Sequence, residues 1–80
     1  MKEPIAVLSP NIRTYWEFLR NEGLNRKTQT DYRLVRNTND IEGYYFSAIL
    51  KLHDWYKLDN VHLLIAILED RIKLAKKLRR

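Results

Sequence analysis

The stretch Ile5-Ala-Val-Leu-Ser-Pro-Asn11 decides the fold of this chain. Its apolar residues 5–8 lie between Pro4 and Ser9-Pro10. Such a short run suits a strand buried on both faces of a parallel sheet, although a fragment of a core helix has the same composition. Ser9 is then a favourable helix N-cap, and Pro10 suits the first helical position. The stretch therefore predicts a buried strand that leads directly into a helix.

The residues that follow predict a helix over positions 10–22. Gly23 fits the left-handed position that ends many helices, and Leu24 supplies the hydrophobic contact that usually follows it. One face of the helix is covered by four apolar residues at helical spacing, Ile12, Tyr15, Trp16 and Leu19.

Two strands and a second helix are predicted in the rest of the chain. Residues 31–36 alternate as a strand does and lead into the turn-forming cluster Asn37-Thr-Asn-Asp40. Residues 44–52 are ambiguous, because their aromatic start favours a strand while Ala48-Ile-Leu-Lys-Leu52 also suits a helix. We prefer a strand over about 45–52. The last helix is expected over about 61–79, capped by Asp59 or Asn60.

The order strand, helix, strand, strand, helix predicts an α/β fold. We expect one domain over residues 1–80, with a small three-stranded, mainly parallel sheet and two helices. An all-α domain is the alternative.

The basic residues concentrate in the last ten positions. Residues 71–80 hold six of the fifteen Lys and Arg residues and no acid, so the remainder of this +5 chain carries 5 − 6 = −1. A concentrated positive patch attracts nucleic acid or an acidic protein surface, although a solvated face that maintains solubility has the same composition. The predicted contact residues are Lys73, Lys76, Lys77, Arg79 and Arg80. Arg71 falls instead on the apolar face, where it either pairs with Asp40, Glu42 or Asp54 or reaches solvent along its own stem.

A second candidate site lies where the carboxyl ends of parallel strands meet, because ligands usually bind at that edge. Ser9 and the free amides of the first helix would hold an anion there, and His53 with Asp54 would support proton transfer or bind a metal. The simpler interpretation makes these residues caps and turn formers only. The candidate residues are Ser9, Asn11, Asn39, Asp40, His53 and Asp54.

Most enzyme classes find no support in the composition. The chain has no cysteine and two histidines, so a thiolate metal site is excluded and no catalytic grouping has a recognisable spacing. We expect no cofactor, no metal and no enzymatic activity. The absence of cysteine fits a cytoplasmic protein, and the apolar runs are too short for a signal peptide or a membrane span. Pairing of two copies through the apolar face of the last helix remains open.

Two resemblances accompany these patterns. Two parts of the sequence resemble small phage-encoded α/β proteins. They are residues 5–11 with Tyr15, and Asp40-Ile-Glu-Gly-Tyr-Tyr-Phe46 leading into Ala48-Ile-Leu50. Those proteins are similar to a fragment of a P-loop or helicase-type fold. The resemblance covers most of the chain and implies an α/β fold in the cytoplasm of a host cell. It does not imply ATP hydrolysis, because the loop Gly-x-x-x-x-Gly-Lys-Ser/Thr is missing.

The second resemblance is local. Phe18-Leu-Arg-Asn-Glu-Gly-Leu-Asn-Arg-Lys-Thr28 with Tyr32 is similar to the N-terminal DNA-clamping domain of tyrosine recombinases. In that family the pattern Gly-Leu-Ser-x-x-Thr-x-x-x-Tyr joins two helices, and here Asn25 replaces the Ser. This resemblance implies an all-α DNA-binding module. The expected function is thus a small binding protein that acts through nucleic-acid or protein contacts, with a degenerate nucleotide- or anion-binding domain or the all-α module as alternatives.

Overall fold

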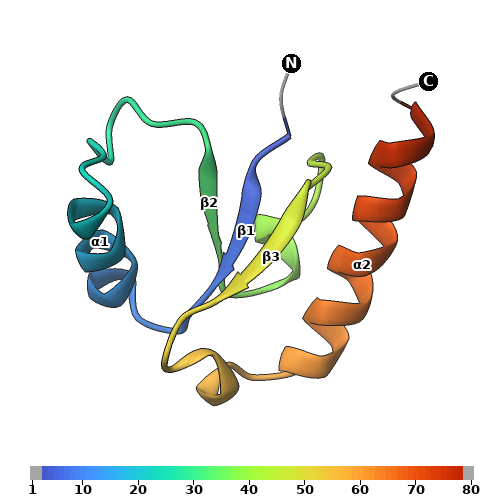
Figure 1. Cartoon of the computed structure of the whole chain (residues 1–80). Coiled ribbons are helices and arrows are strands. Elements are labelled where there is room, and N and C mark those ends of the chain that lie inside the picture. The colour runs from blue at the N-terminus through green and yellow to red at the C-terminus, as the bar shows by residue number, and fades with distance from the viewer. Residues whose placement is uncertain (1–2, 79–80) are drawn as a thin grey trace.

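The computed structural model describes residues 3–78 and has the predicted order of elements (Figure 1). The α/β prediction is confirmed, and the all-α alternative drawn from the recombinase resemblance is wrong. The elements are β1 (Ile5–Leu8), α1 (Ile12–Asn21), β2 (Tyr32–Val35), the short 3-10 helix η1 (Thr38–Asp40), β3 (Ala48–Lys51), a second 3-10 helix η2 (Trp55–Lys57) and α2 (Val61–Leu78).

The sheet has three parallel strands in the order β2-β1-β3. β1 is therefore central, and its residues Ala6, Val7 and Leu8 are fully buried. This burial explains why the deciding stretch is continuously apolar, since both of its faces are covered. The carboxyl ends of the strands and the first turns of both helices lie at one end of the molecule, and the last turns of α2 lie at the other (Figure 1).

Each helix packs against one face of the sheet. Tyr15 and Leu19 of α1 pack with Val7 on the first face. α2 and the segment between β2 and β3 form the larger core on the second face, in which Phe46 and Ile41 are almost completely buried. The remaining buried members of this second core are Ala6, Leu8, Val35, Leu58, Val61, Leu64 and Leu68.

α1 begins two residues later than a cap at Ser9 would require, so that prediction is wrong. Asn11 is the N-cap, and its Oδ1 accepts a hydrogen bond from the Arg13 amide at 2.9 Å. Ser9 is fully buried at the end of β1, and its Oγ is 3.2 Å from both the amide and the carbonyl of Asn11. The helix ends as predicted. Gly23 has φ +72°, and the Leu24 amide donates to the Leu19 carbonyl at 2.9 Å.

β3 is a strand, as preferred, but it is shorter than the predicted range 45–52. β1 starts only at Ile5, and the preceding Pro4 has no amide hydrogen to offer a neighbouring strand. The Ser47 amide donates to the Pro4 carbonyl at 3.0 Å, and regular pairing begins with Ala48. The aromatic residues that suggested an earlier start therefore lie in a loop, where Tyr44 and Tyr45 are each 41% exposed.

Candidate functional site

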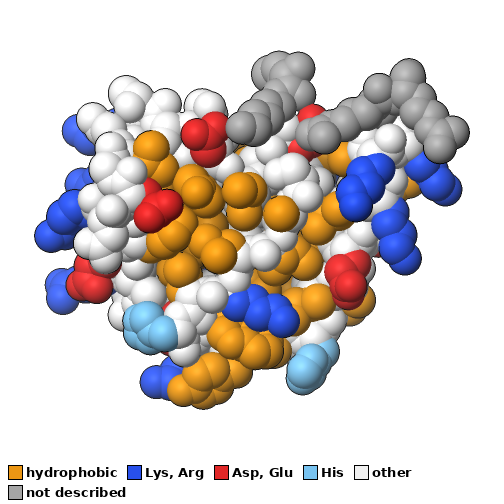
Figure 2. Space-filling model, viewed as in Figure 1, with side chains coloured by type: hydrophobic (Ala, Val, Ile, Leu, Met, Phe, Trp, Pro, Cys, Tyr) orange, Lys and Arg blue, Asp and Glu red, His pale blue; other side chains and the backbone are white. Residues whose placement is uncertain are grey.

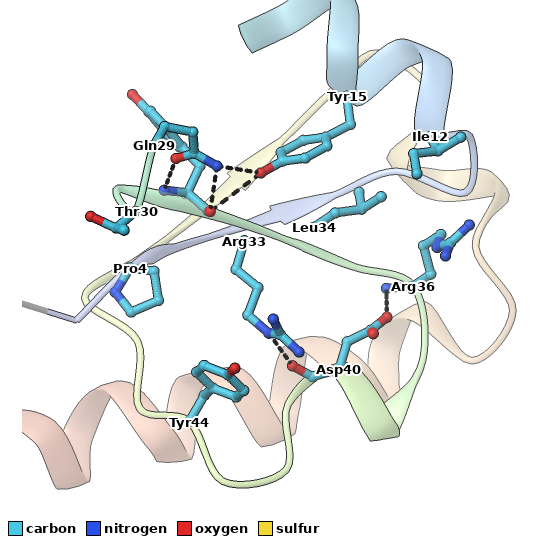
Figure 3. A pocket seen from close by; sticks show the side chains of 11 residues that line it. Pro4, Ile12, Tyr15, Gln29, Thr30, Arg33, Leu34, Arg36, Asp40 and Tyr44 are labelled. Carbon is cyan, nitrogen blue, oxygen red and sulfur yellow. Dashed lines mark hydrogen bonds between the residues drawn. The ribbon is translucent and has the colours of Figure 1, made fainter. Parts of the chain in front are cut away.

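A groove of about 460 Å³ runs along the outer edge of β2 (Figure 3). Side chains from α1 and from the loop before β2 form one wall, and β2, η1 and the following loop form the other. Its lining residues are Pro4, Ile12, Tyr15, Gln29, Thr30, Tyr32, Arg33, Leu34, Arg36, Asp40 and Tyr44. The sequence did not predict this groove, because residues from four separate segments build it.

The side-chain amide of Gln29 closes one part of this edge. Its Oε1 accepts from the Tyr32 amide at 2.9 Å, and its Nε2 donates to the Tyr32 carbonyl at 3.0 Å. Gln29 thus satisfies both groups of Tyr32 that face away from β1, as a neighbouring strand would. Asp40 closes the other end, since its Oδ2 accepts from the Arg36 amide at 2.9 Å.

Leu34 lies between these two closures. The Ile5 amide donates to the Asp31 carbonyl, so the alternation of a parallel ladder turns the amides and carbonyls of Tyr32 and Leu34 away from β1. In the part of the chain that the structure describes, no hydrogen bond reaches the two outward groups of Leu34. The groove therefore offers one free backbone donor and one free backbone acceptor.

Arg33 supplies positive charge to the groove and is held by two contacts. Its Nε donates to the Asp40 carbonyl at 2.8 Å, and its guanidinium carbon lies 3.9 Å from the centre of the Tyr44 ring. These contacts use one nitrogen and one face of the guanidinium, so its terminal nitrogens stay available to an anion. Arg36 directly follows the last residue of β2, and its side chain is exposed (Figure 3).

Tyr15 lies at the α1 side of the groove and acts as a hydrogen-bond donor. Its hydroxyl donates to the Tyr32 carbonyl at 3.2 Å and accepts from Gln29 Nε2 at 3.0 Å. Burial raises the pKa of Tyr15 above its ordinary value, and the Gln29 hydrogen bond and the Arg33 charge oppose that rise. The hydroxyl consequently stays protonated at neutral pH.

The predicted strand-end residues lie near the carboxyl edge but divide into separate local groups. Ser9 and Asn11 serve the turn into α1. Asn39 is exposed on η1, while Asp40 forms a reciprocal capping pair with Asn37. The simpler interpretation of these four residues as caps and turn formers therefore agrees with their contacts.

His53 and Asp54 also differ from the predicted proton-transfer pair. His53 is exposed, whereas Asp54 is 7% exposed and its Oδ2 accepts from Thr14 Oγ1 at 3.1 Å. The second oxygen, Oδ1, is buried without a hydrogen-bond partner. Asp54 thus ties the loop after β3 to the first turn of α1. Among residues 3–78, no three histidine or carboxylate groups gather as a metal site would require.

The basic face of α2, defined here as Lys73, Lys76 and Lys77, is exposed on the last turns of the helix (Figure 2). Within residues 3–78 none of the three ammonium groups forms an ion pair. The other two predicted contact residues, Arg79 and Arg80, lie outside the described residues. None of the described helices has the length and apolarity needed to cross a membrane.

Arg71 reaches away from the core, as one of its two predicted arrangements requires. Its Nη1 donates to the Tyr44 carbonyl at 3.3 Å, and the guanidinium lies 6.0 Å from the centre of the Tyr45 ring. The alternative of an ion pair with Asp40, Glu42 or Asp54 is wrong. Arg33 and Arg71 thereby both contact Tyr44, Arg33 at its ring and Arg71 at its carbonyl.

Comparison with protein-family models, with curated proteins and with solved structures found no match to this chain.

Proposed function

We propose that this protein is a non-enzymatic binding protein that contacts the phosphate backbone of a nucleic acid through the basic face of α2. One observation carries the proposal: three lysines stand exposed on one helix end with no carboxylate partner in residues 3–78. When unpaired ammonium groups neutralise phosphates, the counterions condensed on the nucleic acid are released, and this release drives binding. Lys73 and Lys77 lie about 6 Å apart along the helix axis, so both reach the same strand of a polyanion.

The exposed tyrosines favour nucleic acid over a membrane surface. Tyr44 and Tyr45 each expose 41% of their surface beside Arg71, and exposed rings near cations provide stacking positions for unpaired bases. A membrane-surface helix instead needs a free apolar face opposite its lysines. In α2 that face packs on the sheet, with Leu64 and Leu68 almost fully buried.

The test is fluorescence anisotropy of labelled duplex and single-stranded DNA with the wild type and the variant Lys73→Glu/Lys76→Glu/Lys77→Glu. The matched control is Arg13→Glu/Lys27→Glu/Lys57→Glu, which changes three exposed cations on other elements by the same total charge. The proposal expects loss of binding in the α2 variant and largely retained binding in the control. Equal loss in both variants would show that only the net charge matters and would reject the basic face as the contact surface.

The groove along the outer edge of β2, to which Arg33 supplies positive charge, supports a second candidate function, the binding of a small anion. The supporting observation is a guanidinium fixed by Asp40 and Tyr44 with its terminal nitrogens still open. Thermal shift with ATP and with tripolyphosphate tests this function, because a ligand that binds only the folded state raises the melting temperature. Stabilisation that Arg33→Met abolishes would support the site, and equal stabilisation of wild type and variant would reject it.

A further inference from the structure

The two edges of the sheet are unequal. On β2, Gln29 and Asp40 occupy the outward groups on either side of Leu34. β3 forms the opposite edge of the sheet, next to β1. Natural proteins protect exposed edges against pairing, so an unprotected edge marks a position where another strand adds.

The backbone of β3 presents its free groups in a defined order. The Leu52 amide donates to the Leu8 carbonyl at 3.2 Å, which fixes Leu50 and Leu52 as the residues whose amides face β1. The amides and carbonyls of Ile49 and Lys51 consequently face outward. No hydrogen bond within residues 3–78 reaches any of these outward groups.

The side chains around this edge are apolar. Ala48 is exposed, and Leu50 and Leu52 are half-buried at the α1 face. Ile49 is half-buried against the core on the α2 face. Figure 2 shows many apolar side chains in the region between the two helices, with few charged side chains among them. Such a surface beside an open edge is unusual for a strand that stays in water.

We propose that two copies of this chain pair antiparallel through β3, about a two-fold axis at Leu50, and form one continuous six-stranded sheet from the two three-stranded ones. In this register Ile49 pairs with the partner's Lys51, and Lys51 pairs with the partner's Ile49. Every outward amide and carbonyl of both residues is then satisfied, as in the hydrogen-bonded pairs of an antiparallel ladder.

The edge is complementary to itself, and for this reason the occupant is a second copy. The register places Leu50 beside the partner's Leu50 and Ala48 beside the partner's Leu52, so the α1 face of the joint is wholly apolar. Lys51, the only charged residue of the strand, stands opposite the partner's Ile49 and does not meet a like charge directly. A two-fold axis produces this pairing from one surface, as in most homodimers.

A single cysteine tests this arrangement, because the chain contains none. Leu50 and the partner's Leu50 would form a non-hydrogen-bonded pair with a Cα separation of about 4.5 Å, within the range of about 4.4–6.8 Å that disulfides span. We expect Leu50→Cys to form a disulfide-linked dimer at least about tenfold faster than Leu34→Cys, because pairing holds the two sulfur atoms together. Leu34 is the matched control, since it is also half-buried on the α1 face but lies on β2, where Gln29 and Asp40 occupy the outward groups on either side of it.

Sedimentation of the unmodified chain provides a second measurement that does not depend on a cysteine. We expect a species of twice the 9.7 kDa chain mass, and a single-chain mass for Lys51→Pro, which removes an outward amide that the monomer does not use. Circular dichroism of the Lys51→Pro variant should match that of the wild type. Equal crosslinking of the two cysteine variants, or a wild type that stays monomeric as its concentration rises, would overturn the proposal.

Discussion

Gln29 hydrogen-bonds both backbone groups of Tyr32 that face out of the sheet, with distances of 2.9 and 3.0 Å. A single side-chain amide thus takes the place of a neighbouring peptide unit. Its Nε2 also donates to the hydroxyl of Tyr15, so the same residue links the edge strand to α1. On β2 the outward groups on both sides of Leu34 are thus occupied, whereas no side chain occupies the outward groups of Ile49 and Lys51 on β3 within residues 3–78.

Replacement of Gln29 with leucine should destabilise the fold. The variant would lose three hydrogen bonds and leave the half-buried groups of Tyr32 without these partners, which costs about 1–3 kcal/mol. Urea denaturation measures the change in the free energy of unfolding. Lys27→Ala, an exposed change in the same loop, should stay within about 0.5 kcal/mol of the wild type. Equal stability of Gln29→Leu and wild type would show that the closure contributes nothing.

Tyr15 should make stability fall at high pH. Its pKa in the folded state lies above the ordinary value of 10.0, chiefly because the hydroxyl is buried. The unfolded chain therefore loses this proton first, so the contribution is complete below about pH 10 and declines as pH rises through the folded-state pKa.

Urea denaturation of wild type and Tyr15→Phe at neutral pH and above pH 10 measures this effect. The free energy of unfolding should fall less steeply with pH in Tyr15→Phe than in the wild type. Tyr56→Phe, which changes a tyrosine that is 62% exposed, serves as the control and should keep the wild-type slope. A wild-type slope in Tyr15→Phe would contradict the assignment to Tyr15.

The hydroxyl group of Thr14 should contribute more to the stability of the fold than its β-branched shape does. Its Oγ1 donates the hydrogen bond that reaches Asp54 Oδ2, while Oδ1 of the same carboxylate already lacks a partner. Thr14→Val keeps the shape but strips the buried carboxylate of this bond, so we expect a loss of about 1–3 kcal/mol. Thr14→Ser should lose much less. Equal losses in the two variants, measured by thermal unfolding, would assign the effect to packing.

Arg71→Met should be nearly neutral for stability. Arg71 forms an exposed hydrogen bond to the Tyr44 carbonyl and no ion pair within residues 3–78. Its methylene stem is replaced by one of similar shape, so the free energy of unfolding should change by less than about 1 kcal/mol. A loss of about 3–5 kcal/mol would instead indicate the rupture of a buried ion pair.

The fold was predictable from local signals because those signals agreed with one another. The apolar run at residues 5–8, the glycine at position 23 and the apolar spacing of α2 each specify an element without reference to distant residues. The exact start of α1 was not predictable in this way. Ser9 and Asn11 are both good caps, and the choice depends on the burial of Ser9 at the end of the central strand.

The groove beside β2 was not predictable, because its contacts join residues far apart in the chain. Arg33 alternates correctly within its strand, but its stacking partner Tyr44 belongs to a segment that looked like the start of β3. The roles of the strand-end residues were not predictable for a different reason. Ser, Asn and Asp suit ligand binding and local capping equally well, and nothing in the local sequence distinguishes the two roles.

The most direct test of the proposed function is the salt dependence of DNA binding, measured between about 50 and 200 mM salt. Suppose that Lys73, Lys76 and Lys77 each contact a phosphate of duplex DNA. The variant Lys73→Glu/Lys76→Glu/Lys77→Glu should then have a slope of log K against log salt concentration that is smaller in magnitude by about 3. The control variant Arg13→Glu/Lys27→Glu/Lys57→Glu should keep nearly the wild-type slope. Absence of salt-sensitive binding by the wild type at the lowest salt, to duplex and single-stranded DNA alike, would contradict the account.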